Sequence, residues 1–383
     1  MRVGFGTTVL ASCLAHGGVD GIGSYTRELG KKLSGLEDVS LIPTGFGSTV
    51  PASYFPSTVH HDAPNLGLYA RYAVLSAVSS VAFPNEKLFA GKVDIFHATD
   101  HLIPKFSRIP VVATLMDAIP LSNPEWVRMR LAGAKRWLWR RASHWADHVI
   151  TISEFSKREI VEHFRISPDK ISVTPLGVDA RYFERISLDC RAEVLRRLGL
   201  PERFFLFLGT LQPRKNLDRA LDAHSTLPTA LQAEVPLVVV GRPGWGCDAL
   251  IGRMTDPRLA NTVRWLKYLP DYEVRCLMQS AQALVFPSLC EGFGLPVVEA
   301  FASGLPVVAS NTTSLPEVAC DAALLVNPLD AEEIGEAMLR IVDVPELADR
   351  LSAAGLRRAQ ELTWECCAQM TQGVYRRVLG MAV

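Results

Sequence analysis

Short runs of consecutive apolar residues alternate along this chain with longer stretches whose apolar residues recur every three or four positions. In the first half the continuous runs lie at 2–6, 93–98, 110–117, 148–153 and 170–177. The helical patterns between them lie at 22–33, 67–81, 126–146 and 156–164. Strands that are apolar on both faces and alternate with helices are typical of a parallel sheet covered on both sides. The first half is therefore predicted to be a doubly wound α/β domain.

The same alternation begins again after residue 200. Further apolar runs lie at 203–211, 235–241, 262–269, 283–288 and 305–310, and helical patterns at 216–226, 271–281, 296–303, 315–320 and 331–342. A second doubly wound sheet is predicted, connected to the first by the polar stretch 177–191. The domains are placed at 1–180 and 181–360. The remaining segment, 361–383, is predicted to be a helix that packs back on the N-terminal domain.

Ligands of open α/β sheets bind at the carboxyl ends of the strands, so the residues directly after the apolar runs are the candidates for chemistry. Two such domains are expected to leave a cleft between these edges. The amino-acid composition limits the kinds of binding partner that we expect. The 383 residues include 40 basic and 40 acidic side chains, and a chain without a basic excess is not expected to bind nucleic acid.

The same composition bears on location. No apolar run is long enough for a spanning helix, and residues 2–6 are interpreted as a buried strand and not as part of a signal peptide. The eight cysteines show no zinc-binding spacing. Reduced thiols and a cytoplasmic location are therefore expected.

The segment CEGFGLPVVEA, at 290–300, places Glu291 and Glu299 on either side of a glycine-containing turn. It matches neither common phosphate-binding fingerprint, because it lacks the P-loop lysine and has Val297 at the third glycine position of GxGxxG. The amides of 292–295 would face an anion at a helix N-terminus, while carboxylates accept hydrogen bonds from sugar hydroxyls. A nucleotide sugar has both features. The alternative is a structural interpretation, in which Glu299 only favours the helix dipole and Glu291 is a solvated loop residue.

Residues 284–330 resemble the signature region of retaining glycosyltransferases of family 4, and the resemblance extends over nearly the whole chain. The GT-B architecture of that family consists of two facing Rossmann-like domains. Its motif of two glutamates separated by seven residues matches Glu291 and Glu299. The resemblance implies that Glu291 binds donor-sugar hydroxyls, that Glu299 binds the ribose, and that Gly292, Phe293, Gly294 and Leu295 contact the sugar and diphosphate. It makes 1–180 the acceptor-side domain and 181–360 the nucleotide-sugar-binding domain.

Arg214 and Lys215 supply the cations that the glycine-containing turn lacks. They follow an apolar run and precede a helical pattern, where two donors can neutralise a diphosphate leaving group. An ordinary solvated basic pair is the alternative, but the resemblance implies a diphosphate clamp that also includes Gly209. Many family members have Arg where this chain has Thr210, so the pair must carry more of the charge. Because the chain contains no DxD, we predict no metal and no cofactor besides the nucleotide-sugar co-substrate.

In the first domain, Gly21 and Gly23 lie in a glycine-rich segment before a helical pattern. They would let the backbone approach the donor phosphate or sugar, as loops near the N-terminus of the family do. The alternative is a plain flexible turn.

Four polar residues follow two further apolar runs, namely His97, Asp100, His101 and Asp117. The resembling family segment often has His-Asp at the second place, where this chain has Met116 and only Asp117 matches. We assign Asp117 a catalytic role and Asp100 and His101 the acceptor side. Capping of a neighbouring helix is the alternative for each.

Asp271 lies where the family's base contacts cluster, and it would accept hydrogen bonds from the donor base. It is also a suitable N-cap for the helical pattern that follows. Ser153 and Ser156 are interpreted only as caps of the helix that follows them.

The segment 128–147 combines basic residues with tryptophans. Its cations are Arg128, Arg130, Lys135, Arg136, Arg140 and Arg141, and its indoles are Trp137, Trp139 and Trp145. Leu131, Leu138 and Trp145 share one helical stripe that suits a core. The rest is either a solvated face or a peripheral contact with an anionic membrane.

Three classes of protein fit these features. The first is a glycosyltransferase that uses a nucleotide sugar. The second is a sugar phosphorylase of similar architecture, which would need a lysine for pyridoxal phosphate, and we find no sequence context for one. The third is a GT-B epimerase or a non-catalytic nucleotide-sugar binder. The chain most resembles bacterial mannosyl- or rhamnosyltransferases of O-antigen or exopolysaccharide assembly. That resemblance implies a retaining transferase that moves a hexose from a GDP-sugar to a lipid-linked glycan acceptor at the inner membrane, with a UDP- or dTDP-sugar donor as the alternative.

Overall fold

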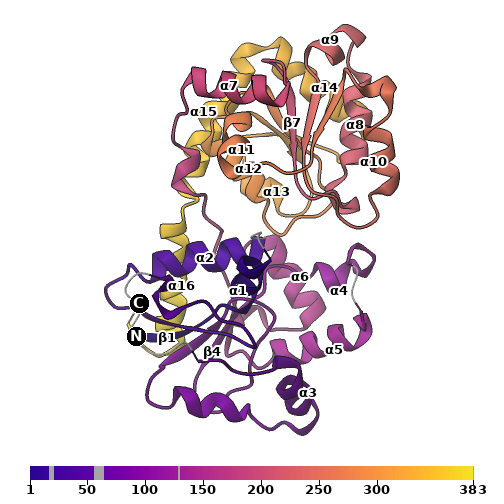
Figure 1. The fold of residues 1–383 in the computed structure, drawn as a ribbon. Helices are drawn as coiled ribbons and strands as arrows, with labels where there is room; N and C mark the ends of the chain where they lie inside the picture. Colours follow the sequence, from indigo (N-terminus) through magenta and orange to yellow (C-terminus); the bar gives the residue numbers. More distant parts are fainter. Residues whose placement is uncertain (17–20, 56–63, 128–129, 383) are drawn as a thin grey trace. The chain divides into compact units, whose positions relative to one another are not determined.

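The computed structural model describes residues 1–16, 21–55, 64–127 and 130–382 (Figure 1). The chain forms two compact units. Unit 1 consists of Met1–Gly177 and Trp364–Val383, and unit 2 consists of Val178–Thr363. Within the described residues, each unit contains one six-stranded parallel sheet with helices packed on it.

The sheet of unit 1 has the strand order β2-β1-β3-β4-β5-β6. The strands are β1 (Arg2–Gly6), β2 (Ser40–Thr44), β3 (Ile95–Ala98), β4 (Val111–Thr114), β5 (His148–Thr151) and β6 (Ile171–Val173). Five of them coincide with predicted apolar runs. Strand β2 was not predicted because Pro43 interrupts its pattern, and it lies at the edge of the sheet, where proline is tolerated.

The helices of unit 1 fall between these strands. They are α1 (Thr8–Ala15), α2 (Gly21–Leu33), α3 (Tyr69–Ser79), α4 (Ile119–Ser122), α5 (Ala132–Ser143), α6 (Glu154–Phe164) and α16 (Trp364–Val378), with 3₁₀ turns η1 (Ala52–Tyr54), η2 (Pro84–Phe89), η3 (Pro124–Trp126) and η4 (Pro168–Lys170). Ser153 caps α6 by accepting from the Ser156 amide at 3.0 Å, as predicted. Helix α16 returns from the end of the chain to pack against α2 and β5.

The sheet of unit 2 has the order β12-β11-β10-β7-β8-β9. Its strands are β7 (Phe205–Leu208), β8 (Leu237–Val240), β9 (Val263–Leu266), β10 (Ala283–Phe286), β11 (Val307–Ser310) and β12 (Leu324–Val326). Strand β12 was not predicted, because three residues are too few for a recognisable pattern. Strand order reverses between β7 and β10, so the loops after these two strands lie at a topological switch point.

The helices of unit 2 cover both faces of this sheet. They are α7 (Leu188–Leu198), α8 (Leu217–Thr226), α9 (Thr229–Glu234), α10 (Asp248–Met254), α11 (Asp271–Met278), α12 (Leu295–Ala302), α13 (Leu315–Ala319), α14 (Ala331–Asp343) and α15 (Pro345–Glu361), with 3₁₀ turns η5 (Ala180–Tyr182), η6 (Pro213–Lys215) and η7 (Pro257–Leu259). In the part of the chain that the structure describes, no helix has the length and apolar character needed to cross a membrane.

Candidate active site

Two loops meet at the carboxyl edge of the sheet in unit 2. One follows β7 and leads through η6 into α8, and the other follows β10 and leads into α12. Asn216 has a left-handed backbone (φ +59°), and its side-chain amide donates to the carbonyls of Pro287 at 2.9 Å and Pro328 at 2.7 Å. The Leu289 amide donates to the Arg214 carbonyl at 2.8 Å. The two loops are therefore tied together by backbone and amide contacts that the sequence pattern did not indicate.

The tied loops bring together Arg214, Lys215 and Glu291. The Lys215 ammonium donates to Glu291 Oε1 at 2.5 Å, and the Arg214 guanidinium donates to Glu291 Oε2 and the Cys290 carbonyl, both at 3.1 Å. The side chains of Lys215 and Glu291 are only 11% and 8% exposed. The alternatives of a solvated basic pair and a solvated loop glutamate are therefore wrong. Burial makes these charges interact more strongly than surface charges do.

Burial and charge act in opposite directions on this cluster. Burial by itself raises the pKa of Glu291, but the charges of Lys215 and Arg214 outweigh it and hold that pKa below its ordinary value. Burial lowers the pKa of Lys215, and the Glu291 carboxylate opposes this effect. The Lys215 ammonium also lies 5.0 Å from the centre of the Phe286 ring. Glu291 therefore holds two cations in place at the ends of β7 and β10.

Residues after β11 hold the backbone of Glu291. The Ser314 hydroxyl donates to the Glu291 carbonyl at 2.9 Å, and Thr313 Oγ1 accepts from the Glu291 amide at 3.3 Å. Thr313 itself has a left-handed backbone (φ +61°), which is uncommon for a β-branched residue. Sequence reasoning missed both residues, because their role depends on a contact more than 20 positions away.

The turn at 292–295 leads directly into α12. Gly294 has φ +99°, and a Cβ built there would lie 2.6 Å from Leu315 Cδ2, so a larger residue would require Leu315 to move. Phe293 is buried, and Pro296 occupies the first turn of α12, as predicted. The turn thus places backbone amides at a helix N-terminus, which favours an anion.

Glu299 lies on α12 in a second cluster of polar side chains, which also contains Asp271 and Tyr182. The Tyr182 hydroxyl donates to Asp271 Oδ1 at 3.3 Å and is also within hydrogen-bonding reach of Glu299. Burial and the nearby Asp271 charge raise the pKa of Glu299 to about 7. Glu299 therefore has polar partners that a purely dipole-stabilising role does not require.

Asp271 is the first residue of α11, and Pro270 is the N-cap, so the predicted capping alternative is wrong. Its Oδ2 lies 3.1 Å from Arg181 Nη1 and 3.4 Å from Arg275 Nε. Sequence reasoning missed Arg181, which lies in the segment interpreted only as a connection. Asp271 therefore shares its carboxylate with two cations and a tyrosine.

The remaining donor-side candidates lie at the starts of loops or helices. Gly209 directly follows β7 with φ +147°, and a Cβ there would lie 3.6 Å from the Lys215 side chain. In unit 1, Gly21 and Gly23 fall in the first turn of α2. The residues before them, 17–20, lie outside the described part of the chain.

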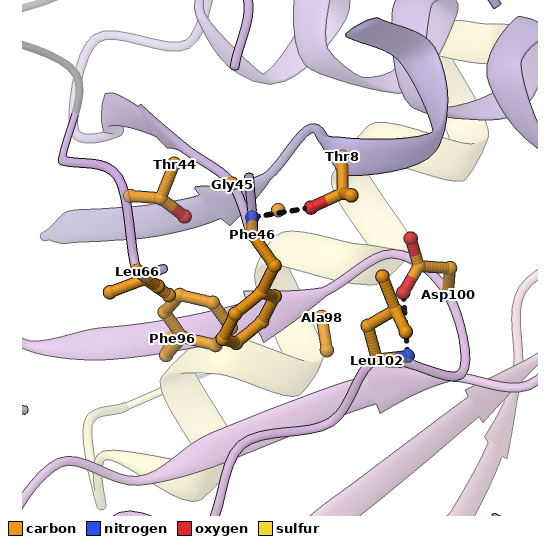
Figure 2. Close-up of a pocket in the computed structure, with 10 residues that line it drawn as sticks. Thr8, Thr44, Gly45, Phe46, Leu66, Phe96, Ala98, Asp100 and Leu102 are labelled. Carbon is orange, nitrogen blue, oxygen red and sulfur yellow. Dashed lines mark hydrogen bonds between the residues drawn. The ribbon is translucent and has the colours of Figure 1, made fainter. Parts of the chain in front are cut away.

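Asp100 lies at the carboxyl edge of the sheet in unit 1, where strand order reverses between β1 and β3. Figure 2 shows its carboxylate beside a small pocket that Thr8, Thr44 and Phe46 also line. Asp100 Oδ1 accepts from the Leu102 amide at 2.7 Å, and Thr8 Oγ1 accepts from the Phe46 amide at 2.8 Å. The pocket holds about 10 Å³, enough for one water and too little for a sugar.

The other acceptor-side candidates also contact their own surroundings. The His101 ring packs edge-on against Trp139, with 4.7 Å between ring centres, and burial lowers the pKa of His101. Asp117 Oδ1 accepts from the Ile119 amide at 3.0 Å, at the start of α4. Asp117 thus orders the turn before α4, although Ala118 and not Asp117 is the N-cap of this helix.

His97 does not face solvent, contrary to its predicted position at an open strand end. Its ring bonds to the Tyr375 hydroxyl at 2.6 Å and to Thr114 Oγ1 at 2.7 Å, and Tyr25 bonds to the same Thr114 atom at 2.8 Å. Complete burial lowers the pKa of His97 to about 3, so the ring is neutral. His97 is a structural residue because β3 carries its side chain into the core.

The segment 128–147 forms α5 over only part of its length, and Arg128 lies outside the described residues. Leu138 and Trp145 pack against the core of unit 1, as predicted. Leu131 does not, because it is 80% exposed just before α5 begins. Of the three residues predicted to pack in the core, Leu138 and Trp145 do so and Leu131 does not.

Two Rossmann-like units in one chain are what the GT-B fold requires, and solved structures of that fold are similar to this chain. Sucrose-phosphate synthase from Thermosynechococcus elongatus matches with a TM-score of 0.74 at 19% identity, covering 99% of both chains. HepE from Anabaena, solved with UDP-glucose, matches with a TM-score of 0.71 at 18% identity, covering 98% of this chain and 100% of the other. The GT-B fold predicted from sequence is therefore confirmed.

Sequence comparisons specify the family. The family model described as Glycosyl transferases group 1 matches residues 195–358, and that described as Glycosyltransferase Family 4 matches residues 19–182. O-antigen chain mannosyltransferase B from Escherichia coli is 30% identical over 368 residues, covering 93% of this chain and 96% of the relative. The MMP alpha-(1->4)-mannosyltransferase of Mycolicibacterium hassiacum is 28% identical, covering 94% and 95%. The chain belongs to the family 4 glycosyltransferases and is a hexosyltransferase.

Proposed function

We propose that this protein is a retaining transferase that moves mannose, or a 6-deoxy relative such as rhamnose, from a GDP-sugar to a lipid-linked glycan. The product would be a cell-surface polysaccharide such as O-antigen. The observation that carries the proposal is the buried cluster of Glu291, Lys215 and Arg214 at the ends of β7 and β10. Two relatives that match over more than nine tenths of this chain are both named as mannosyltransferases, which supports the choice of sugar.

The cluster suits a diphosphate leaving group. Arg214 has five N–H donors and Lys215 has three, so each retains donors beyond those that contact Glu291 and Cys290. Placed at a fixed site of low exposure, they would stabilise the charge that develops on the departing phosphate. We propose that the amides of 292–295 complete this anion site and that no metal takes part. Glu291 would orient the donor sugar through its hydroxyls and would not act as a nucleophile.

The second cluster of polar side chains suits the nucleoside end of the donor. Glu299 would accept from the ribose hydroxyls, and Asp271 would accept from the N–H groups of guanine. Because Arg181 and Tyr182 already engage Asp271, base recognition would need these partners to share the carboxylate. Gly209 would allow the chain to pass close to the diphosphate.

Unit 1 would provide the acceptor side. Asp100, His101 and Asp117 lie at or after the carboxyl ends of β3 and β4, and Gly21 and Gly23 begin α2. Each aspartate accepts from an amide of its own loop, which orients the carboxylate, so either could also position an acceptor hydroxyl. We propose a cytoplasmic protein at the inner membrane, with the segment 128–147 as one peripheral contact.

The test is product NMR after incubation with GDP-mannose and a short glycan acceptor, in parallel with GDP-rhamnose, UDP-glucose and dTDP-rhamnose. An α-linked mannosyl product is expected from the α-linked donor, at a rate unchanged by EDTA. Glu291→Gln should retain more activity than Glu291→Ala, because an amide keeps one acceptor oxygen.

Several outcomes would contradict parts of the proposal. A β-linked product would overturn retention, and transfer only from UDP- or dTDP-sugars would overturn the donor. Donor consumption without transfer would indicate an epimerase. Activity abolished by EDTA and restored by magnesium would contradict the metal-free site.

A further inference from the structure

Helix α3 in unit 1 carries its large aliphatic residues on the outside. The side that it buries consists of Tyr69 and the small residues Ala73, Ser76 and Ala77. Its outer side exposes Leu68 by 70% and Val78 by 76%, and Val74 and Leu75 by about half. Fold stability alone favours the opposite arrangement, because burying an aliphatic side chain removes apolar area from water. The exposed aliphatic residues of α3 are therefore better explained by contact with a binding partner than by the stability of the fold.

The exposed aliphatic residues continue beyond the helix. We define the apolar ridge as Leu68, Val74, Leu75, Val78 and Val81. Among the described residues, sixteen large apolar side chains are exposed, and eight of them lie between positions 68 and 137. Val81 also lines a groove of about 510 Å³ whose wall includes Phe83, Phe89 and Val93. Val74, Leu75 and Val78 follow one another along the exposed side of α3, and adjacent exposed aliphatic residues of this kind mark an interaction surface.

The charge around the ridge is positive. Residues 64–146 contain eleven Lys or Arg and five Asp or Glu, although the whole chain is neutral. Four of these acids accept hydrogen bonds from neighbours, and those of Asp100 and Asp117 come from amides of their own loops. Glu86 accepts from the amides of Ser107, Arg108 and Ile109, and Asp94 pairs with Arg2 at 2.5 Å. The partner of this surface should therefore be anionic as well as apolar.

Helix α5 lies next to α3. It packs against α3 in unit 1 (Figure 1), and its exposed side chains include Lys135, Trp137, Arg140 and Arg141. Trp137 is half exposed, and an indole with one polar N–H suits the boundary between lipid headgroups and acyl chains. Two neighbouring helices thus expose aliphatic residues on α3 and cations with an aromatic residue on α5, where Arg140 also donates to the His163 carbonyl at 3.0 Å.

We propose that the apolar ridge of α3 is the element by which unit 1 inserts into an anionic lipid bilayer, while the cations of α5 hold the headgroups. An anionic bilayer supplies both an apolar interior and a negative surface, and both features match. A second copy of the chain matches poorly, because a symmetric contact would bring two cationic surfaces together. Docking of this kind rests on the proposed function, because a lipid-linked acceptor would lie in the same bilayer. Binding to vesicles can nevertheless be measured without any sugar transfer.

The experiment is flotation of the full-length protein with phosphatidylglycerol-containing vesicles and with pure phosphatidylcholine vesicles, at low and high salt. Wild-type protein should bind the anionic vesicles at low salt and lose most of this binding at high salt. Leu75→Gln with Val78→Gln should weaken binding about tenfold with charge and helix propensity nearly unchanged. Removing Lys135, Arg140 and Arg141 together should weaken binding roughly fivefold per charge, at about 1 kcal/mol each.

A matched control changes two exposed aliphatic residues of unit 2, Leu329→Gln with Val344→Gln, and should bind like wild type. Hydrogen exchange of the wild-type protein provides a measurement that needs no variant. Anionic vesicles are expected to slow amide exchange at residues 68–81. Unchanged binding of the α3 variant, equal binding to both kinds of vesicle, or a dimer that buries 68–81 would overturn the proposal. Assay of the α3 variant with a water-soluble acceptor separates docking from transfer, because its rate should equal that of wild type if the protein is a transferase.

Discussion

At the scale of single residues, the proposed chemistry depends on charges that are nearly removed from water. Lys215 and Glu291 are both almost buried and touch each other, and Arg214 completes the cluster. A buried ion pair gains little net stability, because desolvation offsets the attraction. Its value here would be preorganisation, because the cations need no rearrangement when charge develops on a leaving diphosphate.

Removal of the Lys215 charge should therefore reduce kcat far more than it reduces donor binding. For Lys215→Ala we expect a loss of about 2–4 kcal/mol in transition-state stabilisation, which is the range for a preorganised charge. Steady-state kinetics with a soluble acceptor would measure it, alongside a thermal melt to confirm folding. Arg258→Ala, at a highly exposed cation of the same unit, is the control. Equal activity of both variants would contradict the assigned role.

Glu299 predicts a pH dependence of donor binding. Burial and Asp271 raise its pKa to about 7, so the carboxylate is mostly protonated below that pH and mostly ionised above it. Since the ionised form is the better acceptor for ribose hydroxyls, affinity for GDP-mannose should rise as pH increases through about 7. Calorimetry between pH 6 and 8 would show it, and Glu299→Gln should bind more weakly with a flat profile. The same profile in this variant would assign the titration to another group.

At the scale of elements, a buried polar network joins four pieces of unit 1. His97 on β3 bonds to Thr114 on β4 and to Tyr375 on α16, and Tyr25 on α2 bonds to Thr114. Because β3 and α16 are more than 250 residues apart in sequence, the network holds the end of the chain to its beginning. Buried polar groups that satisfy one another specify one arrangement, since an unpaired member is costly.

Tyr375→Phe should destabilise unit 1 for this reason. The substitution preserves the ring but leaves one His97 nitrogen buried without its partner, which costs about 1–3 kcal/mol. Denaturant unfolding would measure the change, and Tyr268→Phe, at an exposed tyrosine of unit 2, should be neutral. If both variants unfold at the same denaturant concentration, the network contributes nothing to stability.

At the scale of the whole molecule, the two units share one architecture but differ in the polar and apolar residues that they carry. Each places its polar residues at the carboxyl edge of its sheet, next to the strand pair where the order reverses. Unit 2 holds the buried cations and both glutamates of the family motif, while unit 1 holds the apolar ridge and the surplus positive charge. The chain passes from unit 1 to unit 2 after Gly177 and returns after Thr363.

Local patterns in the sequence determined the two sheets, most of their strands, and the candidate residues Arg214, Lys215, Glu291 and Glu299. These features depend on spacing within one strand, turn or helix, which neighbouring residues specify. Strand β2 was not predicted because Pro43 interrupts its apolar pattern. Tyr182 escaped because it lies in the segment interpreted only as a connection.

Only the tertiary structure decided which candidates meet and which are buried. It paired Glu291 with Lys215 across 76 positions, placed His97 in the core, and left Leu131 and the aliphatic side of α3 in solvent. Apolar spacing shows that a helix has an apolar side, but it does not show whether that side faces the core or the solvent. That choice depends on how distant strands and helices pack, because burial and pairing are properties of contacts between segments far apart in the chain.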